Sequence, residues 1–545
     1  MIPVLKQFFD RNTLYGLGGI LSLHIVAWLT QHTVWSAIPF FAIVLAAFIV
    51  TRRSLVWGLA FAMLEIFIGG HGHCIDVSLG GFALGIRQGI FVAVMLGTVY
   101  HIVVHHVRPR FLQERDLPFV VLLIAIALGT ITGFARNSMS AAFDDMNGYA
   151  TLAYLLPVAM IVWTQEAKRV LIWTLALGAT WVAGSSLFLV FLFTHLPVEG
   201  IWALYGFVRD ARLAEVTILS NPEWLMNLFP NGPWYFRVFE QGQFTVMIFT
   251  LVIMAAMIFV AKTWKERASL LLPLALMLAV DVSGQSRSFW LGLIAAGGVM
   301  AIVTLWQRTS VKEIIRLKVT GIVALGIALL GVWALVVFPI PSRPDLTGSQ
   351  YYKGKNDDTR ELAVSSRWNL LPPMMEKIGE NPLWGSGFGT PVTYISDDPR
   401  IRAMNGTGEY TTYRFEWGYQ DIWLKMGIPG LLAFGFYFFT IFRAGRRSII
   451  AQEETRWLSI GLACGVLALF VAHVFSPYLN HPIGLGFMVF VLPFFPWKQE
   501  PLTAVASENI LRFQIPARKT ASVHSVSSSG LKLQNLQCPI GSVDE

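Results

Sequence analysis

Long apolar runs, separated by short polar connections, make up most of the chain as far as residue 497. A helix that spans the hydrocarbon core of a bilayer needs about 20 mostly apolar residues, because in lipid the backbone polar groups can pair only within the helix. The runs that meet this criterion lie near residues 14–30, 34–50, 53–69, 80–104, 117–135, 150–163, 170–194, 244–262, 268–282, 289–306, 319–339, 424–443, 457–475 and 482–497. The pattern therefore predicts an all-α polytopic membrane protein with about 14 transmembrane helices.

The composition supports this class. Of the 545 residues, 55% are apolar and only 14% are charged, whereas soluble domains average about 25% charged residues. Three cysteines exclude a disulfide scaffold, and no group of residues has the paired spacing of a zinc or haem site. The net charge of +8 is spread over separate loops and forms no single stripe, so we expect no nucleic-acid partner.

Basic residues fall in every second connection, as the positive-inside rule requires of cytoplasmic loops. With Lys6 and Arg11 inside, the clusters are Arg52 and Arg53; Arg108, Arg110 and Arg115; Lys168 and Arg169; Lys262, Lys265 and Arg267; Arg308, Lys312, Arg316 and Lys318; and Arg443, Arg446 and Arg447. Both termini are therefore predicted to be cytoplasmic, and the two longest connections to be extracytoplasmic. The chain then divides into N-terminal transmembrane helices (1–194), a first extracytoplasmic loop (195–243), central transmembrane helices (244–339), a large extracytoplasmic loop (340–423), C-terminal transmembrane helices (424–497) and a disordered cytoplasmic tail (498–545).

Three arginines lie at or near membrane depth on the side from which the positive-inside bias should exclude them. Arg87 lies within a predicted span, Arg136 ends one and Arg287 begins another. Charge at membrane depth is costly, so each arginine is a candidate functional residue. The alternative is an interfacial arginine that extends its charged group to the lipid headgroups.

The first long loop adds a further cationic group. The spacing of Arg209 and Arg212 predicts that they share one face of a helix, with Glu215 one turn further on. Arg237 and Glu240 follow where the chain re-enters the membrane. Neighbouring aromatic residues suit stacking on sugar rings, so we interpret the loop as an anion-binding cluster on the outer face. The alternative is an amphipathic helix that lies on the bilayer and is held by salt bridges.

The second long loop ends in a carboxylate, Glu416, near the predicted outer membrane surface. Poor solvation there would raise the pKa of Glu416 toward the range of a general base. The alternative is that Glu416 orients Arg414 or Arg367 through a salt bridge. Arg367 lies in a predicted short helix, and residues 381–389 predict a tight Gly-rich turn around a buried Trp384.

Other polar residues are weaker candidates. Residues 71–76, His-Gly-His-Cys-Ile-Asp, could be drawn as a metal site. Ligands on so short a Gly-rich turn do not converge, so we expect a turn that caps a glycan cavity. His473 and His481 flank a short outer turn and suit a structural or substrate-lining role. Asp281 is expected to pair with Arg287.

Several short motifs together carry a resemblance. They are Asp144-Asp145-Met146-Asn147-Gly148-Tyr149, Ser286-Arg287-x-x-Trp290-Leu291, Arg367-Trp368, Asn381-Pro382-Leu383-Trp384-Gly385-x-Gly387-x-Gly389 and Trp423-Leu424-Lys425-Met426-Gly427-Ile428-Pro429-Gly430-Leu431-Leu432. In order, spacing and membrane side, this set resembles the O-antigen ligase/O-antigen polymerase superfamily of bacterial integral-membrane glycosyltransferases of GT-C type. The resemblance covers residues 80 to 490 approximately.

The resemblance implies an enzyme with a GT-C-like fold in the bacterial inner membrane. It would transfer glycan at the outer face from a polyprenyl-diphosphate-linked oligosaccharide to a sugar hydroxyl, with inversion. Arg209, Arg212, Arg237 and Arg287 would bind the diphosphate, Arg87, Arg136, Arg367 and Glu215 would be further substrate-binding residues, and Glu416 would be the base. No cofactor and no metal are expected. Membrane lipids and other polysaccharide-assembly membrane proteins are the further partners that it implies.

One departure from the family pattern separates two activities. Family ligases carry a His-Asn pair shortly before the glycine that corresponds to Gly427, and the histidine is their presumed base. Here that position holds Glu416 and Trp417, and the loop 340–423 contains no histidine. Glutamate at this point favours a polymerase of surface polysaccharide repeat units over a ligase that transfers O-antigen to lipid A-core. A transporter or flippase of anionic lipid-linked substrates is the alternative from another class.

Overall fold

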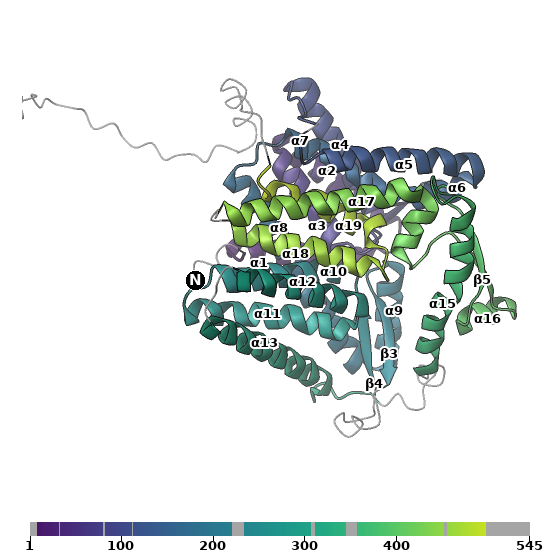
Figure 1. Cartoon of the computed structure of the whole chain (residues 1–545). Coiled ribbons are helices and arrows are strands. Elements are labelled where there is room, and N and C mark those ends of the chain that lie inside the picture. Colours follow the sequence, from purple (N-terminus) through teal and green to yellow (C-terminus); the bar gives the residue numbers. More distant parts are fainter. Residues whose placement is uncertain are drawn as a thin grey trace, which may run out of the picture.

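The computed structural model describes residues 8–31, 33–79, 82–111, 113–220, 234–306, 311–344, 357–451 and 455–497. Within these ranges, ten helices are long and apolar enough to cross a membrane. They include α1 (Arg11–Thr30), α2 (Ala37–Arg53), α4 (Ile86–Val104), α5 (Leu117–Arg136), α8 (Gln165–His195), α11 (Trp264–Gly284), α12 (Arg287–Trp306), α13 (Val311–Val337), α17 (Gly418–Ile450) and α18 (Arg456–His473). They run side by side in one bundle (Figure 1), which confirms the all-α polytopic membrane class.

The remaining predicted spans are shorter. Three apolar helices, α3 (Leu55–Ile68), α10 (Gln243–Phe259) and α19 (Pro482–Phe490), coincide with predicted spans. The span predicted at 150–163 contains the 3-10 helix η3 (Asn147–Tyr154) and the short helix α7 (Leu155–Met160). The number of crossings therefore stays a prediction, although every predicted span contains helix.

Local sequence explains where several helices begin and break. The Asp10 side chain accepts a hydrogen bond from Thr13 N at the start of α1, and Thr263 and Glu266 form the equivalent capping box at α11. In α17 the backbone leaves helical geometry at Gly427, where φ is 65° and only glycine is unstrained. Pro429 follows in the next turn, so α17 is two helical segments joined at a kink.

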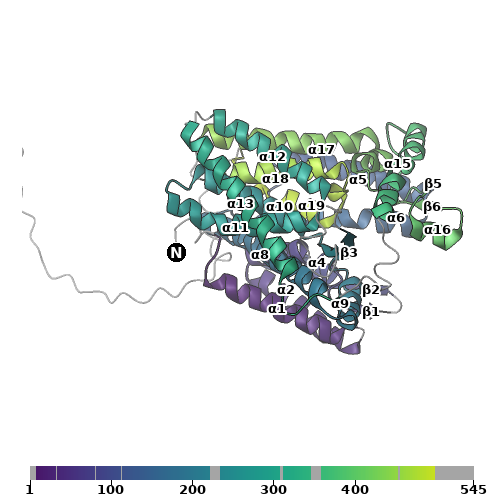
Figure 2. The same cartoon turned by 90° about the horizontal axis from the view of Figure 1, so that it is seen from below.

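The elements outside the bundle gather at one end. They include three antiparallel hairpins: β1 (Asp76–Leu79) with β2 (Phe82–Gly85), β3 (Glu215–Ser220) with β4 (Trp234–Phe239), and β5 (Val392–Ile395) with β6 (Glu409–Thr412). The helices α6 (Met139–Met146), α9 (Val198–Asp210), α15 (Asp357–Glu380) and α16 (Pro399–Asn405) lie at the same end, opposite the N-terminus (Figures 1 and 2). The two longest connections therefore meet on one face of the molecule.

Helix α10 forms the centre of the bundle. It packs against α8, α11 and α18, and its side chains from Gln243 to Ile253 are all buried. A helix that is apolar on every side suits this position, because no face of it meets water or lipid. The outer helices α1, α2 and α13 are instead mostly exposed, as expected of helices that face lipid.

Two local predictions are wrong. Helix α9 ends at Asp210, Arg212 takes a left-handed conformation (φ 49°), and Glu215 begins β3, so Arg209 and Arg212 do not share a helix face. Trp384 is 66% exposed, and the buried aromatic ring of the Gly-rich turn belongs to Phe388. The predicted tail, 498–545, lies outside the described residues, as does part of each long loop.

Candidate functional site

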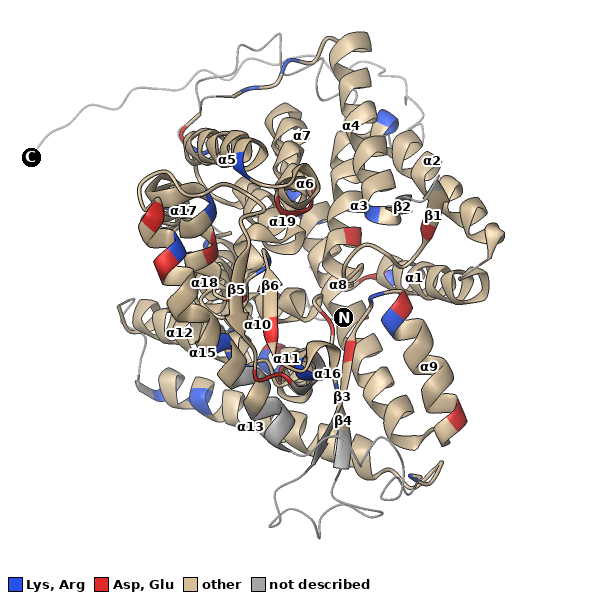
Figure 3. Ribbon diagram, turned by 90° about the vertical axis from the view of Figure 1, so that its right-hand side faces the viewer, with Lys and Arg blue, Asp and Glu red and all other residues tan. Residues whose placement is uncertain are grey.

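Charged residues of both signs lie at the end of the bundle that carries the hairpins (Figure 3). The β3–β4 register places Glu215 opposite Phe239 and Thr217 opposite Arg237, so these side chains share one face of the hairpin. The alternate residues on the other face pack into an apolar cluster with α8 and α9. Arg237 Nε donates a hydrogen bond to Gly284 O at 2.7 Å, which holds the hairpin against the end of α11.

Arg287 is the first residue of α12, directly after the turn that follows α11. Gln285 reverses the chain with a left-handed conformation (φ 48°, ψ 38°). The Ser288 and Ser476 hydroxyl oxygens lie 2.9 Å apart and hold this end of α12 against the connection after α18. Arg287 is exposed. Because the helix dipole opposes a cation at an N-terminus, helix stability does not explain Arg287, and the position favours an anionic ligand.

Arg367 and Glu416 form an ion pair between α15 and the segment that precedes α17. Their side chains are 48% and 51% exposed. The Trp417 indole Nε1 donates to Arg367 O at 2.8 Å, and Trp368 packs edge-on against Trp417 at 4.9 Å between ring centroids. Glu416 is therefore about half exposed, and its contact is the salt bridge of the alternative interpretation.

These residues form one electrostatic group. Burial lowers the pKa of Arg367, Glu215 raises it and Arg287 lowers it, so the three side chains lie within electrostatic reach of one another. Burial and Glu215 likewise raise the pKa of Tyr478, and Arg237 lowers it. We define the Arg287 cluster as Glu215, Arg237, Arg287, Arg367 and Glu416.

A second ion pair lies deeper, between α3 and α4. Arg87 Nε lies 2.9 Å from Glu65 Oε2, and Arg87 Nη2 donates to Gly70 O at 2.8 Å. The two side chains are only 13% and 10% exposed. We did not single out Glu65 from the sequence, although it is the one charged residue in the apolar run 55–68, a pattern that marks a functional candidate.

His71 connects this pair to two further arginines. The pKa of His71 is lowered to about 4, first by burial and then by the charges of Arg87, Arg212, His73 and Arg414. The His71 ring is therefore neutral at neutral pH. Gln241 Nε2 donates to His71 Nε2 at 3.0 Å. We define the Arg87 cluster as Glu65, His71, Arg87, Arg212 and Arg414.

The other two predicted substrate-binding arginines form contacts elsewhere. Arg209 is 63% exposed, pairs with Asp210 at 2.8 Å and lies over the Tyr205 ring. Arg136 Nη1 donates to Asn381 Oδ1 at 3.2 Å, at the end of α5. These contacts give Arg209 the surface salt bridge of the alternative interpretation and make Arg136 part of the framework around the Gly-rich turn.

The Gly-rich turn 381–389 is held between α5 and α17. Phe388 N donates to Gly129 O at 3.1 Å, and Ser386 N donates to Leu424 O at 2.7 Å. Gly387 has φ of 90°, and a Cβ there would lie 2.3 Å from Gly133 N, so only glycine fits. The motif that precedes Glu416 in the chain is therefore a rigid support, in agreement with the structural role predicted for it.

A buried ionic network supports the segment that carries Glu416. Lys425 Nζ lies 2.6 Å from Asp145 Oδ1 and 2.5 Å from Asp421 Oδ1. Asn480 donates to Asp421, and Lys425 also lies 5.4 Å from the centroid of the Phe415 ring, next to Glu416. Removing one partner of a buried pair typically costs about 3–5 kcal/mol. Two motifs of the sequence resemblance, 144–149 and 423–432, thus meet through this network.

Two further carboxylates, Glu240 and Asp281, are buried. Glu240 accepts hydrogen bonds from the Ser185 and Ser186 hydroxyls of α8, and burial raises its pKa to about 7. Asp281 accepts a hydrogen bond from Thr250 Oγ1 at 3.3 Å, so the predicted Asp281–Arg287 pair is not formed. Neither carboxylate reaches the surface on which Arg287 and Glu416 lie.

The histidines near the hairpins have structural partners. His73 Nδ1 lies 2.9 Å from Asp76 Oδ2. His473 is buried, and its Nδ1 accepts a hydrogen bond from Leu479 N at 3.1 Å. Among the residues that the structure describes, no group of three or more His, Cys, Asp or Glu side chains could hold a metal ion.

The fold and the exposed arginines define a multi-pass membrane protein with a charged site at one end of its bundle. Residues 272–435 match the family described as O-Antigen ligase, and this match supports the resemblance to the O-antigen ligase/polymerase superfamily. The matched segment runs from α11 into α17 and includes Arg287, Arg367, the Gly-rich turn, Glu416 and Lys425. The family implies a membrane glycosyltransferase-like activity on lipid-linked glycans. No curated protein matches the chain.

Proposed function

We propose that this protein polymerises surface-polysaccharide or O-antigen repeat units, transferring glycan from a polyprenyl-diphosphate-linked donor to a sugar hydroxyl. The observation that supports this most strongly is the Arg287 cluster. Arg287 and Arg367 come from helices far apart in the chain, lie within electrostatic reach of each other, and are both exposed. Glu416 stands beside them through its ion pair with Arg367.

The chemistry follows from these three side chains. The acceptor hydroxyl oxygen attacks the anomeric carbon of the donor, a new glycosidic bond forms, and the bond from that carbon to the phosphate oxygen breaks. Arg287 and Arg367 bind the departing diphosphate, because guanidinium groups hold phosphate oxygens through paired hydrogen bonds. Glu416 takes the hydroxyl proton. Direct displacement inverts the anomeric configuration, and the arginines supply the positive charge for which other enzymes use a divalent metal.

The Glu416–Arg367 ion pair gives the reaction an order. While the pair is closed, Arg367 occupies the carboxylate that must accept the proton. A bound diphosphate carries more negative charge than a carboxylate and competes for the same guanidinium. Donor binding would therefore release Glu416 for the acceptor. Because both side chains are about half exposed, breaking their ion pair costs little free energy.

Two observations favour polymerisation. Glu416 occupies the position at which family ligases carry histidine. The Arg87 cluster is a second cationic group at the same end of the molecule, in which Arg212 and Arg414 are exposed. A polymerase brings together two lipid-linked diphosphates, one on the donor and one on the acceptor, and two separate arginine groups would hold one each.

The second candidate is an O-antigen ligase, because that is the description of the family that matches residues 272–435. The glycolipids of a deletion strain distinguish the two. We expect single repeat units on the lipid carrier, as loss of a polymerase requires. Full-length chains left on the carrier would identify a ligase.

The proposed location is the bacterial inner membrane, with both termini in the cytoplasm and the Arg287 cluster at the outer face. The basic clusters in alternate connections support this orientation. The gathering of both long connections at one end of the bundle is compatible with it, because a site for completed lipid-linked units must face the compartment where they accumulate (Figure 2).

A further inference from the structure

A second feature lies at the opposite end of the bundle from the hairpins. A cavity of about 410 Å³ opens between α1, the α2–α3 junction and α8. Its walls are almost entirely apolar and include Trp57, Ala60, Leu64 and Trp173. The volume falls in the range of about 300–1,000 Å³ typical of small-molecule sites.

The aromatic walls of this cavity are held in place. Trp173 Nε1 donates to Thr13 Oγ1 at 3.1 Å, and Trp173 packs edge-on against Trp57 at 6.0 Å between centroids. Helix α1 is 17% buried over its span, so it is a lipid-facing wall. The cavity is therefore a preformed apolar slot at the boundary between the bundle and the lipid.

Among the described residues, Arg53 is the one charged residue that lines the cavity. It lies in the last turn of α2 and is exposed. Its neighbour Arg52 points elsewhere, over the Tyr100 ring of α4 at 5.2 Å. An apolar slot with a single arginine at its membrane-surface end matches a lipid with an acyl chain and an anionic headgroup. Anionic phospholipids are concentrated in the cytoplasmic leaflet and attract basic residues there.

We propose that this cavity is a binding site for one anionic phospholipid of the cytoplasmic leaflet. One acyl chain fills the slot between Trp57 and Trp173, and the headgroup phosphate pairs with Arg53. The site shares no residue with either arginine cluster, so it does not depend on the proposed glycosyl transfer, and only its leaflet rests on the proposed orientation.

The test is native mass spectrometry of the purified full-length protein in detergent, with added phosphatidylglycerol or phosphatidylethanolamine. We expect the wild type to retain one phosphatidylglycerol in preference to phosphatidylethanolamine. Arg53→Ala should weaken this retention about fivefold, the effect expected of one arginine at an anionic membrane surface. Arg52→Ala is the matched control and should leave retention unchanged, because Arg52 does not line the cavity.

A second variant tests the slot itself. Ala60→Leu adds apolar volume to the buried cavity wall and should abolish retention while Arg53 remains. Equal losses in Arg52→Ala and Arg53→Ala, or equal retention of the two phospholipids, would overturn the proposal. Retention of a polyprenyl carrier lipid in place of phosphatidylglycerol would also overturn it and assign the slot to the substrate chain.

Discussion

The role of Glu416 can be decided by the size of one effect. As a general base, Glu416 should contribute about 10²–10⁴-fold to turnover. As a mere partner of Arg367, it would contribute far less, because both side chains are about half exposed. Exposed ion pairs contribute about 0–1 kcal/mol, which corresponds to at most about fivefold in donor affinity. The effects expected of the two roles therefore differ in size by more than an order of magnitude.

The perturbation is Glu416→Gln, which keeps size and hydrogen bonding but cannot accept the proton. We expect kcat to fall by about 10²–10⁴-fold, with donor KM changed by less than about fivefold. The assay measures release of polyprenyl diphosphate by purified enzyme in detergent, over donor concentrations that rise to saturation. Near-normal kcat with an altered KM would refute the base assignment and leave Glu416 as an orienting residue.

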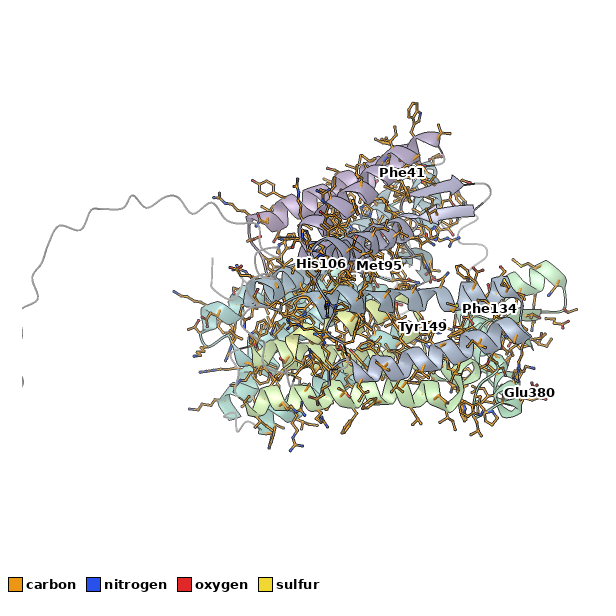
Figure 4. All side chains as sticks on the ribbon, turned by 90° about the horizontal axis from the view of Figure 1, so that it is seen from above. Phe41, Met95, His106, Phe134, Tyr149 and Glu380 are labelled. Atoms are coloured by element: carbon orange, nitrogen blue, oxygen red, sulfur yellow. The ribbon has the colours of Figure 1, made fainter. Side chains whose placement is uncertain are left out.

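Glu380→Gln provides a matched control. Glu380 ends α15 and forms an ion pair with Lys377 at 2.7 Å, and the Glu380 side chain is 52% exposed, nearly the same as Glu416. It lies at the same end of the molecule (Figure 4). The same chemical change there should leave both kcat and KM unchanged. A comparable loss of turnover in Glu380→Gln would show that the assay responds to surface charge in general.

Three further predictions concern other parts of the structure. Arg287→Ala should abolish transfer without affecting membrane insertion, and Arg287→Lys should restore little activity, since lysine keeps the charge but cannot form paired hydrogen bonds to phosphate. Full activity of the lysine variant in the turnover assay would show that Arg287 acts only as a generic interfacial cation. Burial raises the pKa of Glu240 from 4.5 to about 7, so the folded state prefers the neutral acid, and wild-type stability should fall as pH rises from about 4.5 to about 7. Glu240→Gln should remove this dependence of the unfolding temperature on pH, and an unchanged dependence would contradict the assignment. A cysteine at Met404, which is 81% exposed, should react with an impermeant thiol reagent in intact spheroplasts once the native cysteines are replaced, and reaction only after lysis would invert the proposed orientation.

The transmembrane architecture was predictable because apolar length alone decides which segments can cross a bilayer. The structure accordingly has helix in every predicted span. The contacts between charged residues were harder to predict from the sequence, since they join residues far apart in the chain. Arg287 and Arg367 could each be named from the sequence, but their proximity depends on how α12 and α15 pack.

The errors have equally local causes. Two arginines at helical spacing predicted one helix face, but the chain turns at Arg212 and continues as the β3–β4 hairpin. Glu65 was overlooked because its partner, Arg87, lies on the next helix. For Glu416 the sequence named two possible partners, Arg414 and Arg367, and only the packing of α15 selects Arg367.

The central claim is that this protein joins lipid-linked repeat units with no other acceptor, and reconstitution tests it most directly. Purified protein would receive a polyprenyl-diphosphate-linked single repeat unit as its sole substrate, and the products would be separated by chain length. We predict a ladder of multiples of the repeat unit, released with one polyprenyl diphosphate per bond formed and absent in Arg287→Ala. No ladder from the wild type, together with transfer of a completed chain when lipid A-core is added, would contradict the account and identify a ligase.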